Sequence, residues 1–283
     1  IGAALTEEMR RDPRVLIFGE GVATKRHDLL DEFGPARVRD TPLAEGIIAG
    51  TAVGAAATGL RPVIDLLFAP FLCYAMDELV NSAGKLRFIS GGQFAFPMVT
   101  LAMGGGGWGV GAQHNHNNEA WFVHSPGPFF IDLGLLYQAG EVPEGEHLLP
   151  LGKASVLRTG SDVTLVSYGK TVHACLAAAQ QLAEAAISAE VIDLRSLKPL
   201  DEEAIMASVH KTGRLVVAHE AAKMAGVGAE IAAQVAERAF ADLRAPIIRL
   251  GGPDAPAAAS HPLEQAYAPS AEAICAAAKS ICP

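Results

Sequence analysis

Glu45 is a carboxylate within a run of small and apolar residues, "RDTPLAEGIIAGTAVGAAATG", at residues 39–59. Thr41 and Pro42 predict the start of a helix, because threonine can cap a first turn and proline suits its first position. In that helix Glu45 lies one turn from Ile48, on an apolar face where an ionised group needs a partner. Two interpretations stay open: a first-turn glutamate favoured by the helix dipole, or a buried acid held for proton chemistry.

A glycine-rich stretch, "MGGGGWGVGAQHNHNNEAWFVHSPG", follows a predicted strand and contains GxGxxG at Gly104, Gly106 and Gly109. That fingerprint predicts a dinucleotide site only if a helix begins directly after the glycines and an acidic residue lies near the end of the next strand. Here the polar residues "QHNHNNE" follow instead, and Asp132 is the acid that resembles the ribose ligand. A glycine loop with solvated polar residues is the alternative.

Three histidines in the same stretch, His114, His116 and His124, suggest a metal site as a third possibility. An HxH pair can place two rings on one side of an extended segment, but no third ligand has suitable spacing and no CxxC pair supports zinc. We therefore expect this chain to contribute no metal ligands.

Two further groups of side chains follow predicted strands. His219 and Glu220 end a buried strand, where open α/β sheets often bind ligands, although a structural histidine is the simpler interpretation. Phe68 and Phe71 follow another strand, and they either belong to a core or form an aromatic face for a flat ring.

The elements that position these residues alternate in the first half of the chain as repeated βα units. We expect strands at residues 15–20, 62–68, 97–103 and 128–133, with helices centred near residues 52 and 79. Continuous apolar strands of this kind belong to a parallel sheet that is covered on both faces.

A linker, "YQAGEVPEGEHLLPLGK" at residues 137–153, precedes a second alternation. Its strands are expected at residues 162–169, 189–196, 214–220 and 246–252, and its helices from Thr171, Asp201, Gly226 and Leu263. The sequence therefore predicts an α/β protein of two doubly wound domains, residues 1–147 and 148–283.

Composition narrows the function classes. The 283 residues are half hydrophobic, and the net charge of -9 without a run of lysine or arginine argues against nucleic acid or an anionic membrane. The four cysteines form no CxxC pair, which favours a reducing compartment. No apolar run reaches the ~18 residues of a membrane span. The first residues, "IGAALTEEMRRD", lack an initiator methionine and predict an amphipathic helix rather than a secretion signal.

A series of motifs, in a fixed order along nearly the whole chain, resembles the sequences of one known family. They are "FGEGV", "DTPLAEGIIAGTAVGAAATGLRPV", "FAPFLCYAMDELVNSAGKLRFISGGQ", "AQHNHNNEAWFVHSPG", "GEVPEGEHLLPLGKASVLRTGSDVTLVSYG", "VIDLRSLKPLDEEAI" and "GPDAP…LEQAYAPS". The chain resembles the beta subunit of the thiamine-diphosphate-dependent component of 2-oxo acid dehydrogenases, which pyruvate, branched-chain and acetoin dehydrogenases share. The resemblance implies a transketolase-like pyrimidine-binding domain followed by a transketolase C-terminal-type domain.

The resemblance also implies roles for three residues. Glu45 occupies the "TPxAE" position, whose glutamate hydrogen-bonds N1′ of the cofactor's aminopyrimidine and promotes loss of the C2 proton. Phe71 matches the aromatic residue at the pyrimidine ring. His114 matches the histidine of the family's "HSQ" loop near the incoming lipoyl group, although this chain has "HNH" there.

Partners follow from what the chain lacks. No GDG followed by an asparagine is present, so the resemblance implies that an alpha subunit holds Mg²⁺ and the diphosphate in an alpha-two beta-two assembly. A lipoyl acyltransferase core would take the acyl group, in a bacterial cytoplasm or a mitochondrial matrix. The segments after Gly21 and Gly127 are shorter than in the family. Rival hypotheses are a dinucleotide-dependent oxidoreductase using Gly104–Gly109, and a catalytically silent scaffold subunit.

Overall fold

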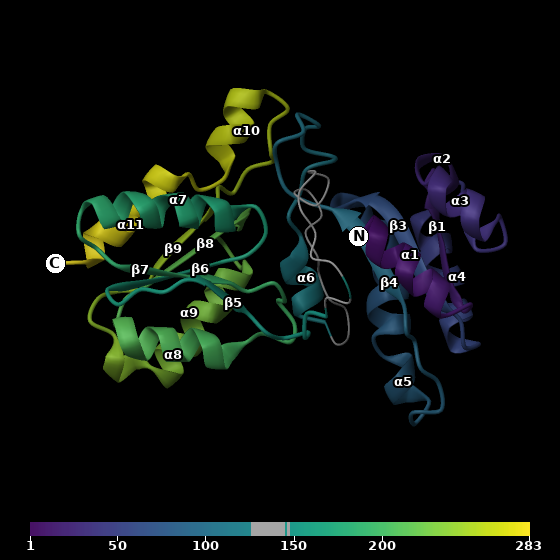
Figure 1. Ribbon diagram of the computed structural model, residues 1–283, viewed down its shortest axis with the longest axis horizontal. Coiled ribbons are helices and arrows are strands. Elements are labelled where there is room, and N and C mark those ends of the chain that lie inside the picture. Colours follow the sequence, from purple (N-terminus) through teal and green to yellow (C-terminus); the bar gives the residue numbers. More distant parts are fainter. Residues whose placement is uncertain (126–144, 146–147) are drawn as a thin grey trace. The chain divides into compact units, whose positions relative to one another are not determined.

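A computed structural model describes residues 1–125, 145 and 148–283 of the chain (Figure 1). Two compact units emerge, the first containing Ile1–Gly104 and the second containing Gly105–Val123 together with the C-terminal residues from 148 onward. Both are α/β, which confirms the predicted fold class. The predicted boundary between residues 147 and 148 borders residues outside the described part of the chain and stays a prediction.

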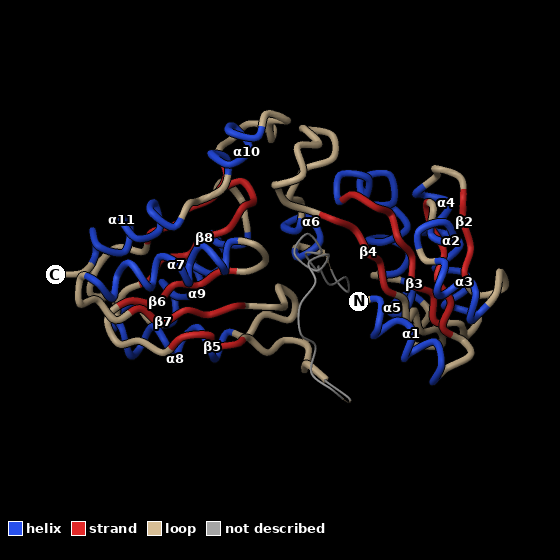
Figure 2. Tube along the Cα trace, turned by 45° about the horizontal axis from the view of Figure 1, so that its top comes forward, coloured by secondary structure: helices blue, strands red, loops and turns tan. Residues whose placement is uncertain are grey.

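The N-terminal unit is built on a parallel four-stranded sheet of order β2-β1-β3-β4 (Figure 2). Its strands are β1 (Val15–Glu20), β2 (Val38–Thr41), β3 (Arg61–Phe68) and β4 (Val99–Met103). Ile17 and Ile64 are fully buried at its centre. β1 is almost entirely buried, as expected for a strand inside a covered parallel sheet, whereas the edge strand β2 buries only Val38.

Seven helical segments accompany this sheet. They are α1 (Gly2–Arg11), α2 (Val22–Lys25), α3 (His27–Phe33), α4 (Glu45–Ala57), the 3₁₀ helix η1 (Ala69–Ala75), the π-helical η2 (Asp77–Ala83) and α5 (Leu86–Ile89). The amphipathic α1 buries Leu5 and Met9 against Leu29 and Val38. The expected helix near residue 52 is α4, whereas the one near residue 79 is the π-helix η2.

The start of α4 differs from the prediction. Residues up to Thr41 pair with β1 as the parallel strand β2, with Thr41 opposite Glu20, so the backbone cannot turn helical there. The helix begins at Glu45, after Ala44. Glu45 is therefore the first helical residue, where the helix dipole favours a carboxylate.

The C-terminal unit has a five-stranded sheet of order β5-β7-β6-β8-β9. Its strands are β5 (Ser155–Arg158), β6 (Val163–Ser167), β7 (Ala189–Asp193), β8 (Leu215–Ala222) and β9 (Ile248–Gly252), all parallel except β5. Its helical segments are α6 (Glu119–Val123), α7 (Thr171–Glu184), α8 (Glu202–Thr212), α9 (Val227–Arg238), η4 (Phe240–Asp242), α10 (His261–Tyr267) and α11 (Ala271–Ile281).

Two apolar cores cover the two faces of this sheet (Figure 1). In one core α7 and α11 pack on the strands through Cys175 and Ile274, and in the other α8 and α9 do so through Ile205 and Ile231. All residues of β6 are buried between them. The unit is thus a doubly wound sheet, as the sequence predicts.

Local sequence signals explain the helix boundaries here. Asp201 caps α8 by accepting a hydrogen bond from the Ala204 N–H at 3.3 Å, as its position predicts. The helix expected from Leu263 is in fact two helices, because Pro269 forces Ala268 into an extended conformation. Ser270 then caps α11. β2 and β5 were not predicted as strands, and the expected strand at residues 128–133 lies outside the described residues.

Within the described residues, no helix combines the length and apolar character that crossing a bilayer requires.

Candidate functional site

The carboxyl edge of the N-terminal sheet gathers acidic groups. Glu20 is the last residue of β1, and Asp65 lies in the neighbouring β3. Gly19 permits this approach, because a Cβ on it would lie 2.1 Å from the carbonyl oxygen of Asp65. Strand ends at such an edge are the usual place for a ligand in an open α/β sheet.

Glu20 is a candidate site residue that the sequence analysis did not identify. Its side chain is only 3% exposed, and its oxygens meet no donor group among the described residues. Burial, and next the neighbouring carboxyl of Glu45, raise the pKa of Glu20, while Lys25 opposes the rise. Because neighbouring carboxyl groups favour sharing a proton, Glu20 is a candidate partner of Glu45 in proton chemistry. An acid that ends a buried strand, as in "VLIFGE", is the signal that could have identified it.

Glu45 is half-buried at the first position of α4. The helix packs against η1, and a Cβ on Gly46 would lie 3.0 Å from the carbonyl oxygen of Tyr74. Since η1 carries Phe71, the structure places Glu45 and Phe71 on two elements in contact. These two predicted residues therefore belong to one region of the N-terminal unit.

An irregular end of β3 positions the aromatic residues. The pairing of β3 with β4 shifts between Asp65 and Phe68, and Leu67 adopts a left-handed φ of 61°. Asp65 supports this bend by accepting a hydrogen bond from the Leu67 N–H at 3.1 Å. The rings of Phe68 and Phe71 then meet edge to face, with centroids 6.0 Å apart. Strained backbone beside a candidate site is consistent with a functional constraint.

Residues Gly105–Val123 of the glycine-rich stretch group with the C-terminal unit. Gly106 donates its N–H to Glu220 Oε1 at 2.5 Å, and Gly109 donates to both carboxylate oxygens of Glu264 at 3.2 Å. The side chain of Asn115 donates to Glu264 Oε1 at 2.9 Å. These buried carboxylates explain why the loop groups with the second unit.

The same contacts contradict the dinucleotide interpretation. The N–H groups of Gly106 and Gly109 already bind carboxylates, which would repel a pyrophosphate. No helix follows the glycines until α6 begins at Glu119. The proposed ribose ligand, Asp132, lies outside the described residues.

The three histidines do not share one environment. His114 is half-buried, whereas His116 is exposed and its ring meets Trp121 edge to face at 5.7 Å. His124 groups with the N-terminal unit, whereas His114 and His116 group with the C-terminal unit. Among the described residues, no group of three or more His, Cys, Asp or Glu residues could hold a metal ion.

His219 has a structural role. It is fully buried, stacks on Tyr168 with ring centroids 5.7 Å apart, and its Nδ1 lies 3.0 Å from the carbonyl oxygen of Ala221. Burial lowers the pKa of His219 to about 4, so the ring is neutral near pH 7. A Cβ on Gly228 would lie 2.7 Å from its Nε2, so the ring occupies space that is open because residue 228 is glycine.

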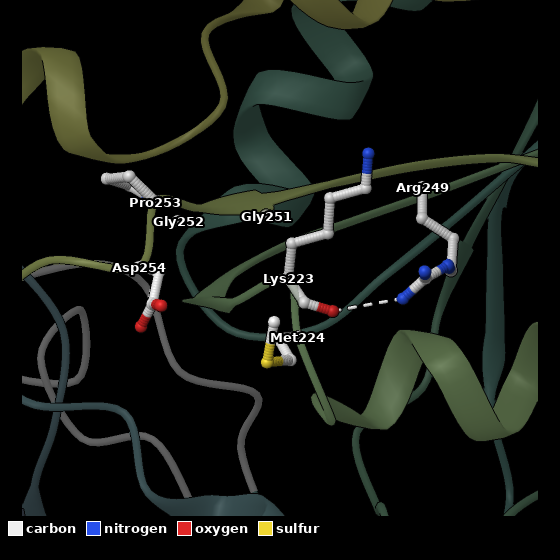
Figure 3. Close-up of a pocket in the computed structure, with 7 residues that line it drawn as sticks. All are labelled: Lys223, Met224, Arg249, Gly251, Gly252, Pro253 and Asp254. Carbon is white, nitrogen blue, oxygen red and sulfur yellow. Dashed lines mark hydrogen bonds between the residues drawn. The ribbon is translucent and has the colours of Figure 1, made fainter.

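A surface hollow of about 460 Å³ lies where β8 and β9 end (Figure 3). Arg249 donates a hydrogen bond to the carbonyl oxygen of Lys223 at 3.0 Å along its wall. It is lined by Lys223, Met224, Arg249, Gly251, Gly252, Pro253 and Asp254. None of the predicted site residues lines this hollow.

Comparisons with known proteins identify the two halves of the chain. Residues 1–181 match the family "Transketolase, pyrimidine binding domain", and residues 152–274 match "Transketolase, C-terminal domain". A solved structure of a split-gene transketolase, an inactive beta4 tetramer, superposes with a TM-score of 0.80 over 99% of this chain and 95% of that chain. At 23% identity, this likeness shows the fold.

Three curated relatives are closer in sequence. Pyruvate dehydrogenase E1 component subunit beta-2 of Oryza sativa is 40% identical over 318 residues, covering 100% of this chain and 85% of the relative. The beta subunit of acetoin:2,6-dichlorophenolindophenol oxidoreductase of Cupriavidus necator is 38% identical, covering 99% and 95%. The beta subunit of 2-oxoisovalerate dehydrogenase of Bacillus subtilis is 38% identical, covering 94% and 92%.

The alignment with the Oryza protein extends over 318 residues, more than the 283 residues of this chain, so that relative contains residues without a counterpart here. This agrees with the expected short segments, although the junction after Gly127 itself lies outside the described residues. Motif order, fold and sequence identity agree. The chain belongs to the family of beta subunits of the 2-oxo acid dehydrogenase E1 component, which are built from transketolase-type pyrimidine-binding and C-terminal domains.

Proposed function

We propose that the chain, together with an alpha subunit, decarboxylates a small 2-oxo acid or cleaves acetoin and passes the acyl group to lipoamide. The names of the relatives support this reaction class, since they include pyruvate, 2-oxoisovalerate and acetoin enzymes. The observation that carries the proposal is the buried Glu20 and half-buried Glu45 pair, beside the element that carries Phe71.

These residues fit an aminopyrimidine. Phe71 offers a ring face on which a flat heterocycle can stack, contributing about 1 kcal/mol beyond its buried area. Glu45 offers a carboxyl group to a ring nitrogen, and Glu20 lies behind it with oxygens that meet no donor among the described residues. Thiamine diphosphate, when bound, supplies an acidic C2–H whose carbon adds to the substrate carbonyl and accepts the electrons released with carbon dioxide.

The role of Glu45 is to exchange a proton with the bound pyrimidine ring. Glu20 would assist by sharing a proton with Glu45, since burial and the neighbouring Glu45 carboxyl raise the pKa of Glu20. Burial of Glu20 excludes water from its side of Glu45. His114 serves the later step, in which the acyl group meets the lipoyl arm, and the loop anchored on Glu264 presents it.

The diphosphate and Mg²⁺ require partners that the described residues do not evidently offer. Hard cations prefer oxygen ligands, and phosphates bind N–H groups at helix N-termini. The described residues contain no cluster of three metal-ligating side chains, and the full sequence has no GDG motif followed by asparagine. An alpha subunit in an alpha-two beta-two tetramer would provide both functions, with a lipoyl acyltransferase core as the next partner. Such an assembly would work in a bacterial cytoplasm or a mitochondrial matrix.

Glu45→Gln tests the proposal in the holoenzyme reconstituted with its alpha subunit. The near-isosteric amide should preserve the fold but slow C2 hydrogen–deuterium exchange of bound cofactor by at least about 100-fold, the usual scale of acid–base catalysis. Glu7→Gln, an exposed acid on α1, is the matched control. Unchanged exchange in Glu45→Gln would show that Glu45 is structural.

Assaying the wild-type holoenzyme distinguishes an active enzyme from a catalytically silent scaffold subunit. An active holoenzyme reduces lipoamide in the presence of 2-oxo acid or acetoin. A chain that assembles with the alpha subunit and binds cofactor without turnover with pyruvate, branched-chain 2-oxo acids or acetoin would be a scaffold instead.

A further inference from the structure

We propose that Glu264 is a positioning residue that fixes the loop carrying His114, with Glu220 as a second anchor. This inference rests on the proposed role of His114 in acyl transfer. The geometry that supports it lies wholly within the C-terminal unit.

Glu264 is a buried acidic side chain whose hydrogen bonds go to the loop, and its Oε2 also lies 3.9 Å from Nδ1 of His261. It is 3% exposed on α10 and accepts hydrogen bonds from Gly109 N and Asn115 Nδ2. Asn115 is itself only 4% exposed and directly follows His114 in the chain. The residue that follows His114 is therefore held by a hydrogen bond to an acidic side chain, and a charge-assisted bond of this kind is stronger than a neutral one.

Glu220 anchors the other end of the loop. It accepts the Gly106 N–H, and Lys170 donates to the Gly106 carbonyl oxygen at 3.0 Å. A Cβ on Gly106 would lie 2.8 Å from Glu220 Oε1 and 3.2 Å from Cγ of Glu264. A glycine at position 106 therefore lets the loop backbone approach both glutamates.

Removing Glu264 should free the loop rather than unfold the unit. In Glu264→Ala, Gly109 N–H and the Asn115 amide lose their acceptors, and buried donors without acceptors are costly, so the loop moves toward water. Glu264→Gln keeps one acceptor oxygen and should retain part of the order. Glu237→Gln, an exposed acid on α9, is the matched control.

Tryptophan fluorescence of the full chain reports the loop directly. The chain has two tryptophans, and both Trp108 and Trp121 lie in the segment Gly105–Val123. In a Trp121→Phe background, acrylamide quenching of Trp108 should rise in Glu264→Ala, rise less in Glu264→Gln, and stay unchanged in Glu237→Gln. Equal quenching in all variants would overturn the proposal.

Activity of the reconstituted holoenzyme supplies a second readout. Misplacing a reacting group by about 1 Å can cost up to about 100-fold, so acyl transfer to lipoamide should fall about 10- to 100-fold in Glu264→Ala. The loss should largely vanish in a His114→Ala background, since residues acting through one group are not additive. Additive losses would overturn the proposal, as would full activity of Glu264→Ala.

Asn115→Ala keeps the test decisive should Glu264→Ala fail to fold. It removes the donor from the other side of the same hydrogen bond, and its circular dichroism is compared with that of the wild type before use. It should reproduce increased quenching and non-additivity with His114→Ala, and absence of both would refute the anchoring role. Failure of the wild-type holoenzyme to transfer acyl groups would instead refute the proposed function and leave the fluorescence result standing.

Discussion

Replacing Glu20 by glutamine should stabilise the protein at neutral and higher pH. Glu20 is 3% exposed, meets no donor group among the described residues and faces the Glu45 carboxyl. Glutamine has nearly the same shape, stays neutral, and can donate its amide to Glu45. The variant therefore imitates a Glu20 side chain that remains protonated at every pH.

The size of the effect follows from burial. Leaving a buried polar group without a partner costs about 1–3 kcal/mol, and more when the group is charged. We expect Glu20→Gln to raise the free energy of unfolding by about 1–3 kcal/mol at pH 8. For a chain of this size, each kcal/mol corresponds to about 2–4 °C in Tm.

The pH dependence has a definite sign. The pKa of Glu20 is raised in the folded chain, so between the unfolded pKa of about 4.3 and the folded pKa the folded chain binds more protons. The free energy of unfolding thus falls as the pH rises through that interval. The advantage of Glu20→Gln should be absent at pH 4 and complete above the folded pKa.

Thermal unfolding of the two full-length chains at pH 4 and pH 8 measures this difference, with Glu7→Gln on the exposed face of α1 as control. Other titrating groups are shared by both proteins and cancel in the comparison. Equal Tm values at pH 8, or an advantage of the same size at pH 4, would refute the reasoning. Cofactor activation in the holoenzyme should fall in the variant, because the shared proton is lost.

Two further predictions concern the cofactor and His219. Isothermal calorimetry of the chain alone with Mg²⁺ and thiamine diphosphate should show no tight binding. Stacking on Phe71 and one hydrogen bond from Glu45 contribute only about 1–3 kcal/mol, which the cost of association offsets. Micromolar affinity without an alpha subunit would contradict a cofactor site shared between two subunits. The ring of His219, with its pKa lowered to about 4, should stay neutral in NMR spectra down to about pH 5, and its need to charge should reduce stability as the pH falls from about 6.5 toward 4. A His219 titration near pH 6.5 in the folded protein would show that the ring is not buried.

Much of the fold could be predicted from local patterns. β1 was predicted with its observed bounds, and the caps at Asp201 and Gly226 marked the starts of α8 and α9. The secondary structure was predicted wrongly where pairing with a strand distant in sequence determines it. Residues around Thr41 carry helix-start signals, yet they form β2 because β1 offers them a parallel partner.

The sequence by itself determined the family and the identity of Glu45, Phe71 and His114 as candidates, since each belongs to an ordered local motif. Only the tertiary structure showed what surrounds them. Glu20 of β1 lies beside Glu45 of α4, and Glu264 meets Asn115 across 149 residues of sequence. Periodicity and caps report neighbours within a few residues, whereas such partners depend on strand order and on where distant helices dock.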